Sequence, residues 1–233
     1  LSGRFNISNY GQDKHRLGDF AQKAKDYADV NKAPRTAKRE KLVIDNFNAW
    51  AGHDITLDRV NQQLIENYKT YLLQERNFKP SSVNIELRHL SAVFTLAVNF
   101  HYISVNPLRG IKKLPVPKKL PRFLTTDQAK KLLGRIEHRP LYIPVAIALG
   151  TGARISEICT LTWKAVDFKR NQILLDGKGS KERLVPMPAF LKTILKTARK
   201  NAADEYVVQG SRDPRTVSKH FHLVVKNMKY LPF

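Results

Sequence analysis

Apolar residues in the first hundred positions recur at intervals of three and four, which is the spacing of one face of an α-helix. The first series is Leu17, Phe20, Ala24 and Tyr27. A second helix is predicted from Pro34 to Gly52, since proline favours a first helical turn and glycine a helix end. A third is expected after a cap at Thr56, and a fourth from Ser81 or Ser82, ending before Asn106-Pro107. The pattern predicts a unit of four helices.

The second half of the chain mixes two periods. Helical spacing predicts helices over residues 126–133, 141–149, 155–161, 189–201 and 214–228, with Ile155, Ile158 and Leu161 facing inward in the third. Residues 172–176 and 183–187 alternate as strands do, and the glycine-rich segment Gly177–Ser180 between them is typical of a hairpin. The fold class is therefore mainly α with a small β-hairpin, an α+β arrangement of two domains.

The two domains are separated by the segment 111–122, which reads IKKLPVPKKLPR. Its prolines prevent a helix and favour an extended chain. We expect residues 1–110 to form the helical domain, 111–122 the basic linker and 123–233 the second domain. The linker is either a solvated connection or an extended segment that lies along a DNA backbone, and beside a basic second domain we favour the second. Its basic residues are Lys112, Lys113, Lys118, Lys119 and Arg122.

Charge narrows the range of partners. The 233 residues include 41 basic and 20 acidic ones, a net charge of +21, and the isoelectric point is about 10.2. Residues 1–110 hold 16 basic against 11 acidic residues, and residues 111–233 hold 25 against 9. Such an excess favours a polyanion such as nucleic acid, with a merely soluble basic protein as the alternative.

Composition also limits the cellular compartment and the kinds of site that the protein can have. Apolar residues make up 42% of the chain, enough for a buried core, and no run approaches the roughly 20 apolar residues of a membrane span. No apolar signal-peptide segment opens the sequence. The one cysteine, Cys159, excludes an internal disulfide and a cysteine-based zinc site. We expect a protein of the cytoplasm, without metal and without a membrane partner.

Two basic residues stand in positions suited to phosphate chemistry. Arg154 follows a glycine turn at a predicted helix start, where unpaired N–H groups and the guanidinium together favour an anion. Lys178 lies between two glycines at the predicted hairpin tip. Taken singly, the arginine is as well explained by a surface ion pair and the lysine by a solvated turn. The hairpin lacks the spacing of a nucleotide-binding phosphate loop.

Taken together, the two segments resemble the tyrosine recombinase (phage integrase) family. Residues 151–163 read TGARISEICTLTW, which is similar to the family's box around its first catalytic arginine, here Arg154. Residues 177–186 read GKGSKERLVP, which is similar to the family's lysine hairpin, here with Lys178. The helical domain, the basic linker and the opening of the second domain also resemble the core-binding domain and catalytic start of these enzymes.

The resemblance implies a two-domain clamp around double-stranded DNA that cuts and rejoins a specific site through a 3′-phosphotyrosyl link, with no cofactor. Arg154 would stabilise the charged transition state, Lys178 would protonate the leaving oxygen, and Glu157 would support the site. A homotetramer on DNA, in a bacterial or mobile-element setting and associated with the nucleoid, is implied for the full-length enzyme. The expected DNA contacts are those of Lys112, Lys113, Lys118, Lys119, Arg122, Lys181, Arg183, Arg215 and Lys219.

Part of the family's site is not found in context. No His-x-x-Arg box is present, Tyr206 is better explained as the start of a short strand, and Tyr230 is the fourth residue from the end. We therefore expect a sequence that stops before the remaining catalytic elements, so that this chain by itself is inactive and its nucleophile is unknown. A DNA-binding module without chemistry and a type IB topoisomerase-like enzyme remain the alternatives.

Overall fold

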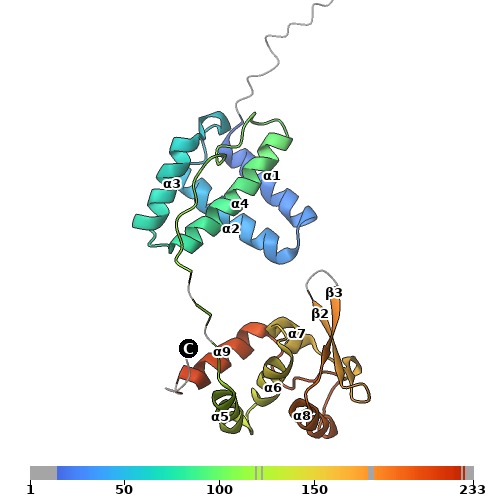
Figure 1. Ribbon diagram of the computed structural model, residues 1–233. Helices are drawn as coiled ribbons and strands as arrows, with labels where there is room; N and C mark the ends of the chain where they lie inside the picture. Colours follow the sequence, from blue (N-terminus) through green and yellow to red (C-terminus); the bar gives the residue numbers. More distant parts are fainter. Residues whose placement is uncertain (1–14, 119, 122, 178–180, 227, 229–233) are drawn as a thin grey trace, which may run out of the picture. The chain divides into compact units, whose positions relative to one another are not determined.

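The computed structural model describes residues 15–118, 120, 121, 123–177, 181–226 and 228 (Figure 1). The chain divides into two compact units, Leu1–Lys119 and Leu120–Phe233. Each unit has its own cluster or clusters of buried apolar side chains, which is what defines a domain physically.

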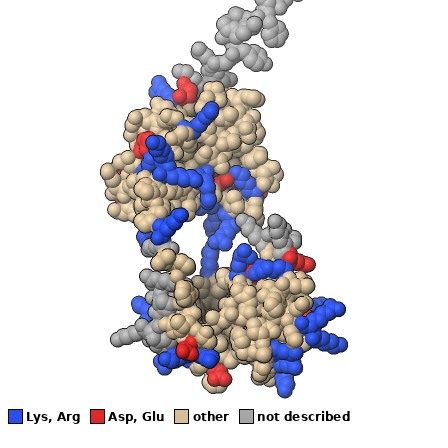
Figure 2. Space-filling model, viewed as in Figure 1, with Lys and Arg blue, Asp and Glu red and all other residues tan. Residues whose placement is uncertain are grey.

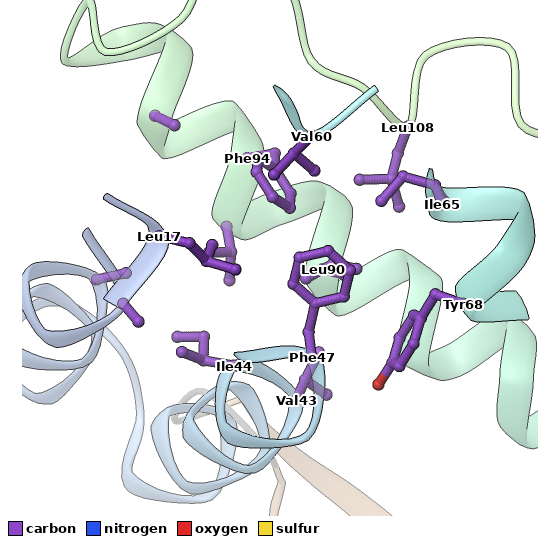
Figure 3. Packing of buried hydrophobic residues seen from close by; sticks show 14 of the residues in the cluster. Leu17, Val43, Ile44, Phe47, Val60, Ile65, Tyr68, Leu90, Phe94 and Leu108 are labelled. Carbon is purple, nitrogen blue, oxygen red and sulfur yellow. The ribbon is translucent and has the colours of Figure 1, made fainter. Parts of the chain in front are cut away.

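The first unit is helical. Its elements are α1 (Leu17–Asn31), α2 (Pro34–Ala51), the short 3-10 helix η2 (Leu57–Arg59), α3 (Gln62–Gln74) and α4 (Pro80–Asn99). The side chains of Phe47, Tyr68 and Phe94 meet between α2, α3 and α4 (Figure 3). The Phe47 ring meets the Tyr68 ring edge-to-face at 5.0 Å between centroids, and the Phe94 ring in the same manner at 5.8 Å. These edge-to-face contacts add to the stabilisation by burial.

Two predicted helix starts are wrong by a few residues. The cap expected at Thr56 precedes only η2, and α3 is capped by Asn61, whose Oδ1 accepts the backbone N–H of Leu64 at 2.9 Å. The helix α4 begins at Pro80 rather than at Ser81 or Ser82. Proline is favoured at the first position of a helix because an N–H at that position would have no intrahelical acceptor, so its absence loses no hydrogen bond.

A buried carboxylate lies inside the first unit. Glu86 on α4 is fully buried and accepts hydrogen bonds from Arg39 (3.1 Å), Asn46 (2.9 Å) and the Tyr68 hydroxyl (3.4 Å). Burial, followed by the nearby Glu86 carboxylate, raises the pKa of Tyr68 well above its ordinary value. The charge of Glu86 is compensated by that of Arg39, as burial of an ionised group requires.

The segment after α4 stays on the first unit. Ile111 and Leu114, which belong to the predicted linker, pack against the core of this unit. Residues 115–118 follow without helix or strand.

The second unit combines helices with a small sheet. The elements are α5 (Thr126–Ile136), α6 (Tyr142–Thr151), α7 (Ile155–Thr160), the 3-10 helix η3 (Trp163–Ala165), β1 (Val166–Asp167), β2 (Gln172–Gly177), β3 (Lys181–Pro186), α8 (Ala189–Lys200) and α9 (Pro214–Lys226). The three strands form an antiparallel sheet in the order β1-β2-β3, with Leu174 opposite Leu184. The predicted hairpin and the α+β class are confirmed, and β3 begins two residues earlier than expected.

Buried side chains join these elements. One cluster links α6, the sheet and α8 through Ile147, Ile173 and Leu191, and another links α5, α6 and α9. The prediction that Ile155 faces inward is wrong, because that side chain is 40% exposed while Ile158 and Leu161 are buried. Ile155 lies in the first turn of a helix of only six residues, whose opposite face packs on the core.

The described residues contain neither a membrane-spanning helix nor a metal-binding cluster. None of the helices in that part of the chain is both long and apolar enough for a membrane span. Within the same residues, no group of three or more His, Cys, Asp and Glu side chains is placed to hold a metal ion.

Candidate active site

The arginine of the first motif lies where α6 gives way to α7. Gly152 follows α6 with a φ of 65°, a left-handed conformation that favours glycine. The Thr151 hydroxyl donates to the carbonyl of Ile147 at 2.6 Å and accepts the N–H of Ala153 at 3.1 Å. This turn places Arg154 at the N-cap of α7, with a side chain that is 68% exposed. Its guanidinium is therefore accessible to a ligand from solvent.

Glu157 holds this arginine and a second one. Its carboxylate accepts hydrogen bonds from the Arg154 side chain and backbone N–H, both at 2.8 Å. It also accepts two from Arg183 on β3, one to each carboxylate oxygen, both at 2.7 Å. A two-point bond of this kind orients the guanidinium as well as attracting it. The buried glutamate thus joins α7 to β3 across 26 residues of sequence.

The charge state of Glu157 follows from these contacts. The hydrogen bonds from Arg183, and to a smaller extent those from Arg154, together lower the pKa of Glu157 to about 2, against the opposing effect of burial. The carboxylate is therefore ionised at neutral pH, and the group of Arg154, Glu157 and Arg183 carries a net charge of +1. Such a group can bind an anion while keeping its arginines in place.

The predicted catalytic lysine, Lys178, belongs to the same sequence motif as Arg183 but lies outside the described residues. The last described pair of the β2–β3 hairpin is Gly177 opposite Lys181. Lys178 falls between these two residues in the sequence, and its role stays a prediction. Lys181 lies in β3, and its side chain is outside the description.

The other predicted DNA-binding residues are spread over both units. Lys112, Lys113 and Lys118 are exposed after α4, and Arg215 and Lys219 are exposed on α9. Lys119 and Arg122 lie outside the described residues. Arg183 directs two nitrogens at Glu157, which gives it a supporting role that the sequence did not reveal, and its DNA contact stays a prediction.

The sequence contains a signal for one buried polar residue, Glu86, that the sequence analysis did not use. Glu86 lies three residues after Val83 and four before Leu90, so it interrupts the apolar face of α4. A carboxylate at such a position predicts a buried partner. Arg39 could not be identified as that partner from spacing, because it lies 47 residues away.

Comparison with sequence families agrees with this geometry. Residues 122–231 match the sequence model described as the phage integrase family, and residues 16–114 match the phage integrase SAM-like domain. Together the two matches cover almost all of both units. The chain belongs to the phage integrase family of tyrosine recombinases.

Curated relatives carry the same family name. The chain is 37% identical over 108 residues to tyrosine recombinase XerA of Thermococcus onnurineus, covering 43% of this chain and 37% of that protein. It is 28% identical over 183 residues to XerA of Thermococcus kodakarensis, covering 77% and 61%. Tyrosine recombinase XerC of Pediococcus pentosaceus is 29% identical over 174 residues, covering 70% and 57%. The chain thus spans between about a third and two thirds of the length of these relatives.

Solved structures share the fold. A lambda integrase tetramer bound to a Holliday junction superposes with a TM-score of 0.80 at 17% identity, covering all of this chain and 72% of that one. The Tn1549 transposon integrase in complex with a circular intermediate DNA superposes with a TM-score of 0.68 at 21% identity, covering 84% and 69%. The matches favour neither the non-catalytic module nor the topoisomerase-like alternative.

Proposed function

We propose that this chain is the DNA-binding and partly catalytic portion of a site-specific recombinase that cuts and rejoins DNA. The observation that carries the proposal is Arg154, an exposed guanidinium held by the buried carboxylate of Glu157 in the family's first motif. Preorganised cations of this kind stabilise the charge that develops on a phosphate during displacement.

In the proposed reaction, the hydroxyl oxygen of a tyrosine attacks the scissile phosphorus, and the hydroxyl proton is released to water. The bond to the 5′-oxygen breaks, and a 3′-phosphotyrosyl link forms. Arg154 binds the non-bridging oxygens, and Lys178 gives a proton to the leaving 5′-oxygen. Glu157 and Arg183 hold Arg154 in position. The reaction keeps the phosphoester energy in the covalent link and needs no cofactor. The attacking tyrosine is not assigned to a residue of this chain.

The proposed partner is double-stranded DNA at a specific site, in the cytoplasm, with a homotetramer as the assembly of the full-length enzyme. Support comes from the net charge of +21 and from relatives solved as integrases on DNA, one of them a tetramer on a Holliday junction. The proposed phosphate contacts are Lys112, Lys113, Lys118, Lys119, Arg122, Lys181, Arg183, Arg215 and Lys219. Such contacts position a protein on DNA, and contacts to the bases specify the site.

The test begins with selection of a preferred duplex from a random-sequence library by this chain. The protein expressed from its complete reading frame is then incubated with a nicked suicide duplex of that sequence. We expect a protein–DNA adduct that survives SDS. Arg154→Ala is expected to retain DNA binding and lose the adduct, whereas Arg170→Ala, which removes an exposed arginine beside Asp167, is expected to keep both.

The role of Lys178 has its own test. A duplex in which sulfur replaces the scissile 5′-bridging oxygen has a leaving group that needs no proton. Lys178→Ala is expected to cleave normal DNA slowly and the sulfur-containing DNA at the rate of the unmodified protein. Lys196→Ala, an exposed lysine on α8, is the matched control. Absence of any adduct from the complete protein on its selected duplex would overturn the proposed chemistry, and relaxation of plasmids without a preferred site would favour a topoisomerase.

A further inference from the structure

The chain that leaves α4 is attached to the first unit by side chains of two helices. It runs back along α4 after the helix ends (Figure 1). Asn106 donates from its amide to the carbonyl of Ser91 at 2.9 Å and to the Thr95 hydroxyl at 3.0 Å. Gln62 on α3 donates to the carbonyl of Arg109 at 2.6 Å. The path of this segment is therefore determined before the predicted linker begins.

The attachment continues through residues 111–114, which we call the strap. The Asn84 amide on α4 donates to the carbonyl of Leu114 at 2.9 Å, and its oxygen accepts the N–H of Leu114 at 2.8 Å. Lys69 on α3 donates to the carbonyl of Lys112 at 3.2 Å. These bonds engage backbone groups, so they hold the strap in one register whatever its side chains are. Leu114 precedes Pro115, the first of two prolines before the second unit.

Docking of the strap places its cations beside one on α4. Arg88, Lys112 and Lys113 line a single groove with Asn84 and Ser91. All three basic side chains are exposed, and in the described part of the chain no carboxylate forms an ion pair with any of them. Lys and Arg side chains gather on the face of the first unit shown in Figure 2. Three unpaired cations around one groove suit a run of phosphates.

We propose that Asn84 is a positioning residue, which docks the strap so that Arg88, Lys112 and Lys113 bind the DNA backbone in one groove. The inference rests on the proposed function for its ligand and adds a residue without charge to the binding machinery. It also divides the predicted linker. Residues 111–114 are held on the first unit by the Asn84 and Lys69 side chains.

Salt dependence of DNA binding separates this role from a merely structural one. Each phosphate contact contributes about 0.9 to the slope of log affinity against log salt concentration. We expect Arg88→Ala and Lys112→Ala, measured with the 233-residue chain and a duplex of arbitrary sequence, to lower that slope by about 1 each. Asn84→Ala changes no charge and favours the helix, yet is expected to lower the slope by about 1 to 2 because the strap lysines leave the groove. Adding Lys112→Ala to Asn84→Ala should then lower it little further.

Two control variants match these changes. Asn31→Ala removes an asparagine bond to the Tyr27 carbonyl at the end of α1, and Lys41→Ala removes a lysine that pairs with Asp29. Both should keep the slope of the unmodified chain. Hydrogen exchange gives a second readout, in which the Leu114 N–H is protected in the unmodified chain and exposed in Asn84→Ala while the α4 amides stay protected.

An unprotected Leu114 N–H in the unmodified chain, or an unchanged salt slope for Asn84→Ala, would overturn the inference. If the unmodified chain binds DNA with a steep salt dependence and the variants show the same slope, the inference about Asn84 fails while the proposed function stands. Absence of salt-dependent binding by the unmodified chain would instead remove the proposed DNA partner, and the groove with it.

Discussion

Replacement of Glu157 by glutamine tests how the second unit holds its arginines. The carboxylate of Glu157 accepts four hydrogen bonds, two from Arg183 and two from Arg154. A glutamine keeps the shape of the side chain but replaces one of the two carboxylate oxygens with an NH₂ group. This NH₂ group is a donor, so it cannot accept hydrogen bonds from the arginine N–H groups that face it. At least one guanidinium therefore loses its bond, and both lose the compensating charge.

The structure sets the size of the effect. Removing one partner of a buried ion pair costs roughly 3–5 kcal/mol, because the other charge is left buried and unpaired. Here the Arg154 side chain is 68% exposed and that of Arg183 is 37% exposed, so both can regain water. We therefore expect a cost of about 2–3 kcal/mol to the second unit, the value for one or two charge-assisted hydrogen bonds. For a unit of this size the melting temperature should fall by about 8–12 °C.

The pKa of Glu157 determines how the stability difference between the two proteins should change with pH. Arg183 and Arg154 hold the pKa of Glu157 at about 2, below its ordinary value of 4.5. A group whose pKa is lower in the folded state stabilises that state fully above its unfolded pKa, and this stabilisation is lost as the pH falls toward its folded pKa. The difference in stability between the unmodified chain and Glu157→Gln should be constant between pH 6 and 7 and shrink from about pH 4.5 to about pH 2.

The assay uses calorimetry to measure the thermal unfolding of the unmodified chain and of Glu157→Gln across this pH range. Glu182→Gln is the matched control, since it makes the same chemical change at an exposed position next to Arg183. It should unfold like the unmodified chain. A Glu157→Gln protein within about 0.5 kcal/mol of the unmodified one at pH 7, the usual range for a surface substitution, would refute the reasoning. A stability difference that does not change with pH would refute the assigned charge state.

Three further substitutions test the cores and turns. Phe47→Ala removes a ring at the centre of the first unit and is expected to cost that unit about 3–5 kcal/mol in denaturant unfolding; a cost under about 1 kcal/mol would contradict the packing in Figure 3. Gly152→Ala meets no atom within 4 Å but must adopt a φ of 65°, so unfolding should show a loss of about 1–2 kcal/mol, and no loss would contradict the left-handed turn. Glu86→Gln leaves Arg39 without its carboxylate and should lower the melting temperature of the first unit, whereas an unchanged value would mean that the buried pair is not formed.

Helix ends show one limit of local pattern. The apolar spacing of α1 predicted the buried residues Leu17, Phe20 and Ala24. Such spacing could not choose between neighbouring capping residues, because Thr56, Asn61 and Ser81 all carry a suitable oxygen. The choice depends on the backbone conformation before the helix, and the chain enters α3 through η2.

Local helical structure and the two motifs could be predicted from the amino-acid sequence. Three- and four-residue spacing follows from the helical period, so it predicts which face of a helix is buried. The motifs around Arg154 and in the hairpin likewise belong to the sequence, and they carried the family resemblance. The hydrogen-bond partners emerge from the tertiary fold, and they are Arg183 for Glu157, Arg39 for Glu86 and Leu114 for Asn84. These pairs lie 26, 47 and 30 residues apart, where contact depends on the path of the intervening chain and no local periodicity reports it.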